Sequence, residues 1–597
     1  MIKLLKHMDK LSYLLIFIVI GLVVLQVYSD LELPTRLQEI LNTASKAEVA
    51  IAQGTMTEEL RTTYRNDVLR SGLEMFGFAV VTLTSSILVC LLAARIASKF
   101  SYNLRKEVYR HIQKFSISEI DKFSTASLIT RTTNDITQVQ MVVIMTLRMA
   151  IAAPTMAILG ILKAGRIESA ARLSLIVVIS VVALVTLVIS IFLIVLPKFK
   201  KIQELTDRLN LVTRENLTGI RVVRANCAQE FQENKFNEVN ISVSKTHIFV
   251  NRMLNLMNPG MMLIMNGTSL AILWVGAYII NENPMFLGSV FTFQQITMMI
   301  VIAFMQLIMI FIMVPRGLVS ARRVREVLDV SPSLHNPIHP ASLEEGIKGV
   351  IEYEDVSFSY PNSNENVLDH ISFKVNQGDT IAIIGSTGSG KTSLINLLPR
   401  FFDVTEGRVL VDGVDVKEYD MAVLREKIAF IAQKALLFKG TVRSNLAYGK
   451  EDATEAEMKE ALKLAMAEDF VLNHPDGLDQ GVAQGGSNFS GGQKQRLSIA
   501  RALIKKPEII VFDDSFSALD FKTDKILRDN LKKLDYNPTK IIVAQRIGTI
   551  MDADLILVLE KGKIVGAGKH KELIKTCEVY QEIAYSQVSK EEIDHAA

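Results

Sequence analysis

The chain has 597 residues, too many for one hydrophobic core, because single domains rarely exceed about 250–300 residues. Hydrophobic residues make up 49% of it and its mean hydropathy is +0.27, which excludes a disordered protein and is unusual for a soluble one. With 66 basic and 63 acidic residues the net charge is +3, so composition indicates no nucleic-acid partner. The three cysteines are far apart and indicate neither a metal cluster nor a disulfide framework.

The apolar residues are concentrated before about Leu318, in six runs long enough to span roughly 30 Å of hydrocarbon. The runs are Leu11–Tyr28, Gly72–Ala97, Val139–Leu162, Leu173–Leu196, Leu254–Ile280 and Met285–Val314. The first follows three lysines, as the apolar core of a secretory signal does, but no small-residue cleavage site follows it, which favours a retained helix. We therefore predict an all-α transmembrane domain of six helices over residues 1–318.

The loops between the runs predict an orientation. Loops 98–138 and 197–253 are long and rich in Lys and Arg, whereas the alternate loops are short or net acidic. The positive-inside rule then places the basic loops and both termini in the cytoplasm, with the chain in the cell (inner) membrane. Helical periodicity in both basic loops predicts that the membrane helices continue into the cytoplasm, each loop forming a helical hairpin with a short helix at its tip.

The character of the chain changes after Arg316. Residues 319–348 hold a charged amphipathic segment and then a linker with several prolines. Beyond it, short β-branched strands such as Thr380–Ile384, Ile509–Phe512 and Ile541–Val543 alternate with helical segments, which predicts an α/β domain over residues 349–590. The fold class is therefore multi-domain, an all-α membrane domain fused to an α/β domain.

A glycine-rich segment follows the first of these strands. Residues Gly385–Thr392 match the P-loop pattern G-x-x-x-x-G-K-[ST], in the strand–loop–helix context that the motif requires. Its backbone N–H groups wrap phosphates, Lys391 reaches the β- and γ-phosphates, and Thr392 offers a hydroxyl to Mg²⁺. The pattern predicts ATP contacts from Gly385, Ser386, Thr387, Gly388, Ser389, Gly390, Lys391, Thr392 and Ser393.

Two further segments carry chemistry. The apolar strand Ile509–Phe512 ends in Asp513 and Asp514, and an acid at the end of a buried strand is how such sites hold Mg²⁺, so Asp513 is the predicted metal ligand; an Asp that caps the next turn is the alternative. The motif Ser490-Gly491-Gly492-Gln493 precedes a helix and forms a second anion site. One P-loop already covers one nucleotide, so the second site needs a separate explanation.

Together these motifs resemble an ATP-binding cassette (ABC) exporter half-transporter, and the resemblance covers essentially the whole chain. In that family the Ser-Gly-Gly-Gln signature binds the γ-phosphate held on the P-loop of the opposite domain, which implies a second half-transporter as partner. The resemblance also implies that Tyr360 stacks on adenine, although a solvent-exposed aromatic is the alternative, and that Gln433 senses Mg²⁺ and the attacking water. It further implies that the loop Ser517–Asp520 crosses the dimer. The coupling segments that it implies in the two cytoplasmic loops are Ile120–Phe123, Leu128–Asp135 and Thr218–Ala225.

Two positions depart from the family pattern. After the strand acid the family usually has glutamate, where this chain has Asp514, and further on it usually has histidine, where this chain has Gln545. The Asp carboxylate is one methylene shorter, and a misplacement of roughly 1 Å can cost about 10²-fold in rate. Gln545 cannot carry positive charge toward the γ-phosphate. We therefore expect a site that binds Mg-ATP and hydrolyses it slowly.

This combination of an intact signature with altered catalytic positions resembles one half of a heterodimeric bacterial multidrug exporter. The implied activity is ATP-driven efflux of drugs or other amphipathic compounds, with hydrophobic or amphipathic cargo and the lipid bilayer as further partners. A homodimer with two slow sites, including a homodimeric lipid or peptide exporter, is one alternative. A nucleotide-gated channel or regulator is another, although no regulatory insert is visible between Arg316 and Gly349.

The fifth and sixth spans are rich in methionine and carry interleaved amides, including Gln294 and Gln306. Methionine adapts to promiscuous apolar ligands, although ordinary packing explains any single one equally well. The amides are better candidates for a cavity wall, because polar groups avoid lipid. Arg148 in the third span is expected at the inner interface, with contact to anionic cargo as the alternative.

Overall fold

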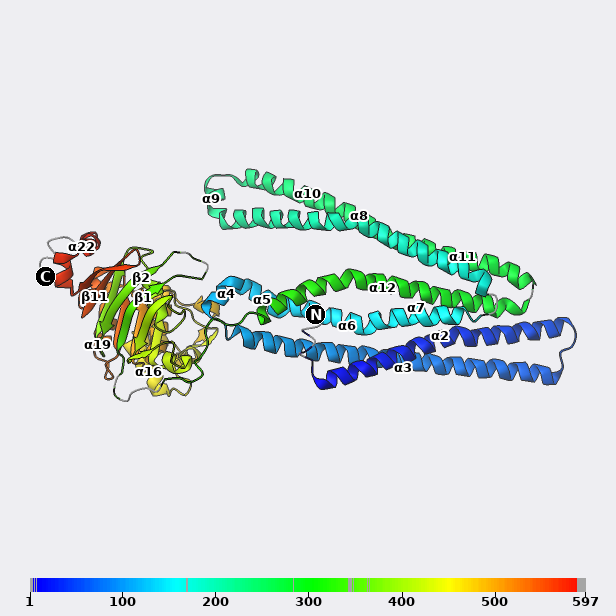
Figure 1. The fold of residues 1–597 in the computed structure, drawn as a ribbon, viewed down its shortest axis with the longest axis horizontal. Helices are drawn as coiled ribbons and strands as arrows, with labels where there is room; N and C mark the ends of the chain where they lie inside the picture. Colours follow the sequence, from blue (N-terminus) through cyan, green and yellow to red (C-terminus); the bar gives the residue numbers. More distant parts are fainter. Residues whose placement is uncertain are drawn as a thin grey trace. The chain divides into compact units, whose positions relative to one another are not determined.

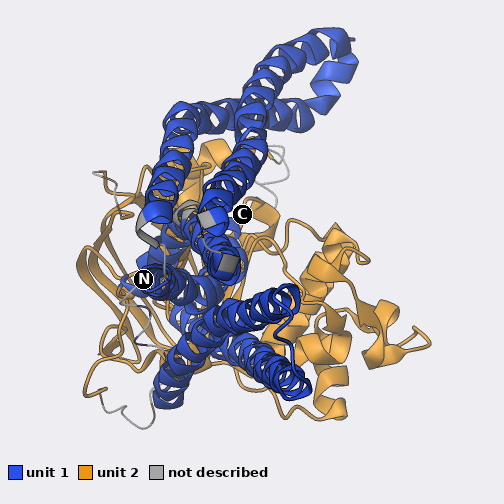
Figure 2. Cartoon of the chain, turned by 90° about the vertical axis from the view of Figure 1, so that its right-hand side faces the viewer, with its two compact units in different colours: residues 1–113, 126–330 blue, residues 114–125, 331–597 orange. Residues whose placement is uncertain are grey.

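The computed structural model describes residues 4, 6, 8–167, 170–282, 284–341, 346, 348–361, 363 and 365–587. The chain divides into two compact units, residues 1–113 with 126–330 and residues 114–125 with 331–597 (Figure 2). The first unit is helical, and all strands of the described residues lie in the second. The tip of the first long loop, residues 114–125, therefore belongs to the unit that holds the strands.

Long helices joined by short turns make up the first unit (Figure 1). They are α2 (Lys10–Ala52), α3 (Glu58–Ile112), α5 (Thr125–Thr130), η1 (Arg131–Asp135), α6 (Ile136–Met145), η2 (Thr146–Ala150), α7 (Ile151–Ala164), α8 (Ala170–Thr218), α9 (Ile220–Ala225), α10 (Gln229–Asn255), α11 (Met257–Glu282), η3 (Pro284–Phe286) and α12 (Leu287–Leu328).

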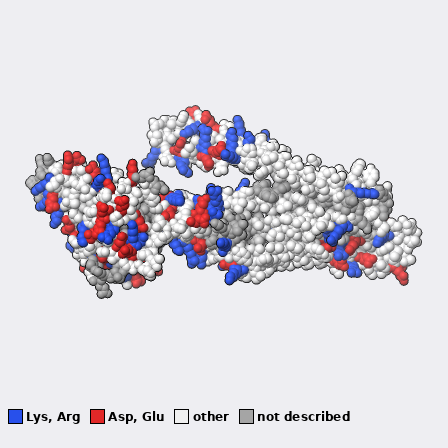
Figure 3. All heavy atoms as spheres, viewed as in Figure 1, with Lys and Arg blue, Asp and Glu red and all other residues white. Residues whose placement is uncertain are grey.

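Six helical stretches of the described residues are long and apolar enough to cross a membrane, and each overlaps one of the six predicted runs. The prediction of six membrane helices is confirmed. On the face of the first unit that Figure 3 shows, charged side chains gather toward the two ends of the helices, and mostly uncharged surface lies between them. That pattern is expected of a helix bundle whose middle faces hydrocarbon.

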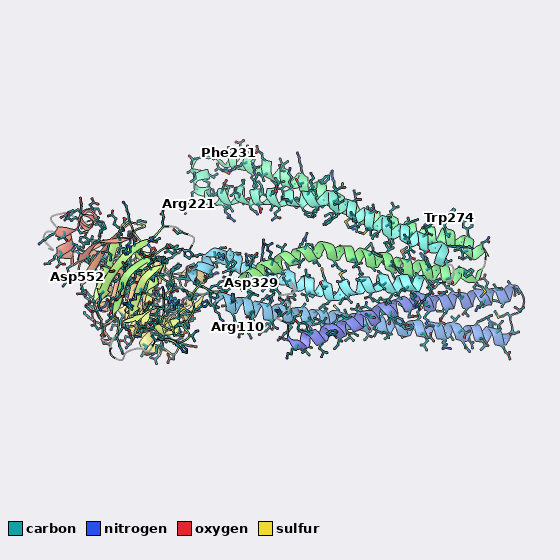
Figure 4. All side chains as sticks on the ribbon, viewed as in Figure 1. Arg110, Arg221, Phe231, Trp274, Asp329 and Asp552 are labelled. Carbon is teal, nitrogen blue, oxygen red and sulfur yellow. The ribbon has the colours of Figure 1, made fainter. Side chains whose placement is uncertain are left out.

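Both basic loops are helical hairpins, as predicted. Helix α3 continues to Ile112 and α8 to Thr218, and the short helices α4 (Ile117–Phe123) and α9 (Ile220–Ala225) form the tips. Arg221 and Phe231 lie at the α9 end of the second hairpin, and Trp274 lies far from it on α11 (Figure 4).

Residues 29–71, which we predicted only as a loop between spans, are also largely helical. Helix α2 runs on to Ala52, and α3 begins at Glu58, where Thr57 caps it by accepting a hydrogen bond from the Leu60 N–H at 3.2 Å. An ion pair of 3.0 Å between Arg36 and Glu74 joins the two helices. Pairing between the helices therefore extends them beyond the apolar runs that the sequence shows.

A π-helical turn, η1, is linked to the last turns of α12. Asp135 is 5% exposed, and its Oδ1 accepts a hydrogen bond of 2.7 Å from Ser320 Oγ. Arg131 donates to the Arg323 carbonyl at 2.7 Å and pairs with Glu326 at 3.0 Å. These contacts hold the end of α12 against the start of α6, so the two helices are mechanically joined near the tip of the first loop.

We expect Ser320→Ala to lower the melting temperature of the purified chain. Among the described residues Asp135 Oδ2 has no hydrogen-bond partner, so the variant also leaves Oδ1 of this buried carboxylate without its donor. An unsatisfied buried polar group costs about 1–3 kcal/mol, and more when it is charged. Thermal unfolding in detergent measures the effect. Ser242→Ala, which removes an exposed hydroxyl on α10, is the matched control, and equal melting temperatures for both variants would contradict the prediction.

Among the described residues, the second unit contains short helices and twelve strands. Its strands are β1 (Ile351–Phe358), β2 (Leu368–Val375), β3 (Thr380–Gly385), β4 (Glu406–Val411), β5 (Val414–Asp415), β6 (Ile428–Ile431), β7 (Gly440–Thr441), β8 (Gly481–Val482), β9 (Ile509–Asp513), β10 (Thr539–Val543), β11 (Leu555–Glu560) and β12 (Lys563–Gly568). Besides α4, its helices are α13 (Lys391–Leu397), α14 (Met421–Lys427), α15 (Val442–Leu446), α16 (Glu455–Leu464), α17 (Glu468–Val471), η4 (Gly477–Asp479), η5 (Gln484–Gly486), α18 (Gly491–Leu503), α19 (Phe521–Lys532), α20 (Ile547–Ile550), α21 (His570–Thr576) and α22 (Glu578–Tyr585).

The main sheet has six strands in the order β12-β11-β3-β10-β9-β6, parallel except for β12, and a smaller antiparallel sheet has the order β2-β1-β4-β5. Side chains of the central strands alternate between two cores. Ile510 and Phe512 belong to one and Ile509 and Val511 to the other, so the main sheet is buried on both faces. Ile117 of α4 packs against the second core. The strands of this buried sheet therefore hold in place the residues that follow their ends, which form the site described next.

Candidate nucleotide site

Four neighbouring strands bring the predicted residues together. Strands β3, β10, β9 and β6 are adjacent and parallel, so their carboxyl ends meet at one edge of the sheet. The P-loop follows β3, Gln545 follows β10, Asp513 ends β9 with Asp514 directly after it, and Gln433 follows β6. Residues up to 160 positions apart in sequence therefore converge through strand order alone.

These residues line a cavity of about 270 Å³. Its lining residues are Val367, Thr387, Gly388, Ser389, Gly390, Lys391, Thr392, Ser393, Gln433, Asp513, Asp514, Val543 and Gln545. Sequence reasoning missed Val367 and Val543, because an apolar wall carries no chemical signature. Of the predicted site residues, Gly385, Ser386, Tyr360 and the Ser-Gly-Gly-Gln motif are absent from this described lining.

The P-loop has the backbone that an anion cradle needs. Gly390 has φ +100°, a conformation that other residues rarely adopt, and a Cβ there would lie 3.0 Å from the Val367 carbonyl oxygen, so only glycine fits without strain. The Lys391 ammonium donates to the carbonyls of Gly385 and Ser386 at 2.8 and 2.7 Å. Burial lowers the pKa of Lys391, while the nearby carboxylates of Asp514 and Asp513 oppose that shift. A half-buried ammonium at the mouth of a glycine loop is suited to bind phosphate oxygens.

Thr392 and Asp513 present two oxygens side by side. Thr392 Oγ1 donates to Asp513 Oδ1 at 3.2 Å. Burial raises the pKa of Asp513, and the neighbouring charge of Asp514 raises it further. A buried carboxylate of this kind is stabilised by a cation, and Mg²⁺ typically takes one or two protein oxygens and completes its shell with phosphates and water. The two residues therefore fit Mg²⁺, which would neutralise phosphate charge when bound.

Asp514 and Gln545, the two residues predicted from the sequence to slow hydrolysis, are hydrogen-bonded to each other. Gln545 Nε2 donates to Asp514 Oδ2 at 2.9 Å, and Gln433 Nε2 donates to the same oxygen at 3.1 Å. Burial raises the pKa of Asp514, while the hydrogen bond from Gln433 lowers it. The pKa of Asp514 stays raised on balance, so the limit on this carboxylate as a base is geometric: Oδ2 already accepts two amide donors and is less free to accept a proton from water.

The signature motif forms the N-terminus of α18. Ser490 Oγ accepts from the Gln493 N–H at 3.3 Å, and the Ser490 N–H donates to Gln493 Oε1 at 2.9 Å, a reciprocal capping box. Ser490 and Gly491 are both exposed, and a Cβ built on Gly491 meets nothing within 4 Å. The helix start is therefore open to a ligand from outside this chain's own cavity.

Tyr360, the predicted adenine-stacking residue, lies beside the P-loop helix. Its hydroxyl is 2.9 Å from Ser393 Oγ, and its ring packs edge-on against Phe358 and Phe402. The ring therefore lies next to Ser393, which lines the cavity. The stacking of Tyr360 on adenine stays a prediction.

Lys391→Ala is expected to weaken ATP binding at this site by about 10²-fold, because a charge-assisted contact contributes roughly 1.5–3 kcal/mol. Binding of a fluorescent ATP analogue to the purified chain measures the effect. Lys494→Ala, a half-buried lysine of α18 outside the cavity, is the control. Unchanged affinity in Lys391→Ala would contradict the assignment of the P-loop.

Similarity to known proteins identifies the family of both parts of the chain. Residues 368–517 match the ABC transporter domain family, and residues 14–313 match the ABC transporter transmembrane region. The chain belongs to the ABC transporter family. It combines one membrane domain with one ATP-binding domain, the half-transporter arrangement, and its ATPase activity is coupled to transport. The match to a transmembrane region, together with six sufficiently long apolar helices in the described residues, shows that the chain is an integral membrane protein.

Several relatives are similar over most of their length. An uncharacterized ABC transporter ATP-binding protein of Mycobacterium bovis is 40% identical over 523 residues, covering 87% of this chain and 89% of the relative. The ATP-dependent lipid A-core flippase of Desulfotalea psychrophila is 33% identical over 504 residues, covering 82% and 85%. YgaD of Bacillus subtilis, which its name assigns provisionally to multidrug export, is 31% identical over 489 residues, covering 80% and 82%.

A solved structure shares the fold. The structure of a bacterial Atm1-family ABC exporter with ATP bound aligns with a TM-score of 0.77 over 96% of this chain and 98% of that one, at 23% identity. At that identity the likeness shows the exporter fold alone.

Proposed function

We propose that the chain is one half of a heterodimeric exporter that uses ATP to move drugs or other amphipathic compounds out of the cell. The observation that carries the proposal is the Gln545–Asp514–Gln433 arrangement. Asp514, in the position of the catalytic base, has a shorter side chain than glutamate and accepts hydrogen bonds from two amides. Gln545 is neutral and occupies the position where the family usually has a histidine, which can carry positive charge. The P-loop beside them is complete, so this chain's own site binds ATP with Mg²⁺ on Thr392 and Asp513 and turns it over slowly.

The intact signature supplies the complementary role. Ser490–Gln493 cap an exposed helix N-terminus that can close on a γ-phosphate held by a partner chain. One composite site, made from the partner's P-loop and this signature, then carries most of the hydrolysis.

The membrane topology follows from the distribution of charge. The loops with the most Lys and Arg are the hairpins tipped by α4 and α9. Both hairpins and both termini lie on the cytoplasmic side, and the membrane is the cell (inner) membrane. Export of amphipathic compounds is supported by the relatives named for lipid A-core flipping and, provisionally, for multidrug export.

Affinity purification of the tagged chain from its native membranes tests the proposal. We expect a second half-transporter in a 1:1 ratio, and little ATPase activity from the chain expressed alone, since a homodimer would have two slow sites. A fully active homodimer without a second chain would overturn the asymmetric arrangement.

A further inference from the structure

The membrane domain contains an apolar cavity of about 640 Å³ between α8, the end of α10, α11 and α12. Val185, Phe192 and Phe199 line it from α8, and their spacing of seven residues places them on one face of that helix. Met257 of α11 and Phe304 of α12 close it from the other sides. A volume of this size lies within the range of ligand pockets, roughly 300–1,000 Å³.

A single charged residue, Arg316, occurs in the described lining of the cavity. It follows the lining residue Leu307 by nine positions, which places it about 14 Å further along α12, toward the end that leads to the ATP-binding domain. Arg316 is exposed, and among the described residues no carboxylate forms an ion pair with it. An unpaired guanidinium at the rim of an apolar cavity in a membrane domain is a candidate ligand contact.

We propose that this cavity binds an amphiphile with an anionic head group, a carboxylate or a phosphate. The head group pairs with Arg316, whose planar fork matches both groups, and the apolar tail lies along Phe192, Phe199 and Phe304. A cationic amphiphile is repelled by Arg316, and a neutral one leaves the guanidinium unpaired. The identification of this ligand as cargo rests on the proposed export function, but the binding itself requires no transport.

Photolabelling of the full chain in phosphatidylcholine nanodiscs, without ATP, tests the proposal. The probes are a diazirine-bearing fatty acid and the fatty alcohol with the same chain, and peptide mass spectrometry locates the labels. We expect the acid to label the cavity-lining parts of α8 and α12 about tenfold more than the alcohol, because a charge-assisted hydrogen bond is worth at least a factor of that size. Arg316→Gln should abolish the preference, and Arg316→Lys should retain part of it.

Arg95→Gln is the matched control, because Arg95 is also exposed in a membrane-domain helix but lies outside the described lining. Equal labelling by acid and alcohol in the unmodified chain, or a preference that survives Arg316→Gln, would overturn the proposal. Adding phosphatidylglycerol to the nanodiscs identifies the source: competition with the acid assigns the site to an anionic lipid, and unchanged labelling assigns it to a free amphiphile. Because no step requires ATP hydrolysis, failure here leaves the export function standing, and failed transport with intact labelling overturns only that function.

Discussion

Gly491→Asp is expected to reduce ATPase activity of the assembled transporter by about 10²-fold or more, the usual cost of losing one preorganised contact to a reacting oxyanion. Gly491 is the first residue of α18, and a Cβ there meets nothing within 4 Å, so the substitution does not disturb this chain. A carboxylate at a helix N-terminus is even favourable to the helix. The loss therefore has to arise where the signature meets a nucleotide on another chain.

The comparison with Ser490→Ala shows why Gly491 is the sharper test. Ser490 caps α18 through its bond with the Gln493 N–H, so its removal also costs about 1 kcal/mol of helix stability. Gly491→Asp separates the two effects, because its melting temperature should equal that of the unmodified chain. Gly491→Ala, which adds only the Cβ, should lose less activity than Gly491→Asp. Near-normal turnover in Gly491→Asp would show that the signature does not act on a hydrolytic site.

Asp514→Asn is expected to change turnover of the complex by no more than a few-fold, whereas Glu→Gln at the corresponding position of the partner should abolish it. Asp514 Oδ2 already accepts two amide hydrogen bonds, and removing its charge takes away little basicity that the reaction uses. ATPase rates of the two purified complexes, measured side by side, decide the matter. Equal and near-total losses would show that this chain's site is required for catalysis.

A reverse substitution strengthens the test. Asp514→Glu with Gln545→His restores the usual residues at two contacting positions, so the pair has to be changed together. We expect faster hydrolysis at this site only in the double variant, and only if the partner's signature still closes on the γ-phosphate. Gln545→Asn, which keeps an amide but shortens it, serves as the control for disturbance of the pocket.

Local sequence patterns determined much of this protein. Six apolar runs are enough to predict six membrane helices, because hydrocarbon demands about 20 apolar residues in a row. The Gly385–Thr392 motif predicts a phosphate cradle, because the conformations it needs are set by its own glycines. The strands around Ile383 and Val511 are recognisable from short β-branched runs bounded by turn residues.

Only the tertiary structure decided what depends on contacts between distant segments. Strand order brings Gln433, Asp514 and Gln545 within hydrogen-bond distance, and no local pattern contains that order. The helical form of residues 29–71 depends on pairing between α2 and α3, including the Arg36–Glu74 ion pair. The cavity beside Arg316 exists because α8, α10, α11 and α12 leave space between them. Packing depends on several segments at once. Local sequence patterns therefore predict the individual helices, strands and motifs, but not which of them contact one another.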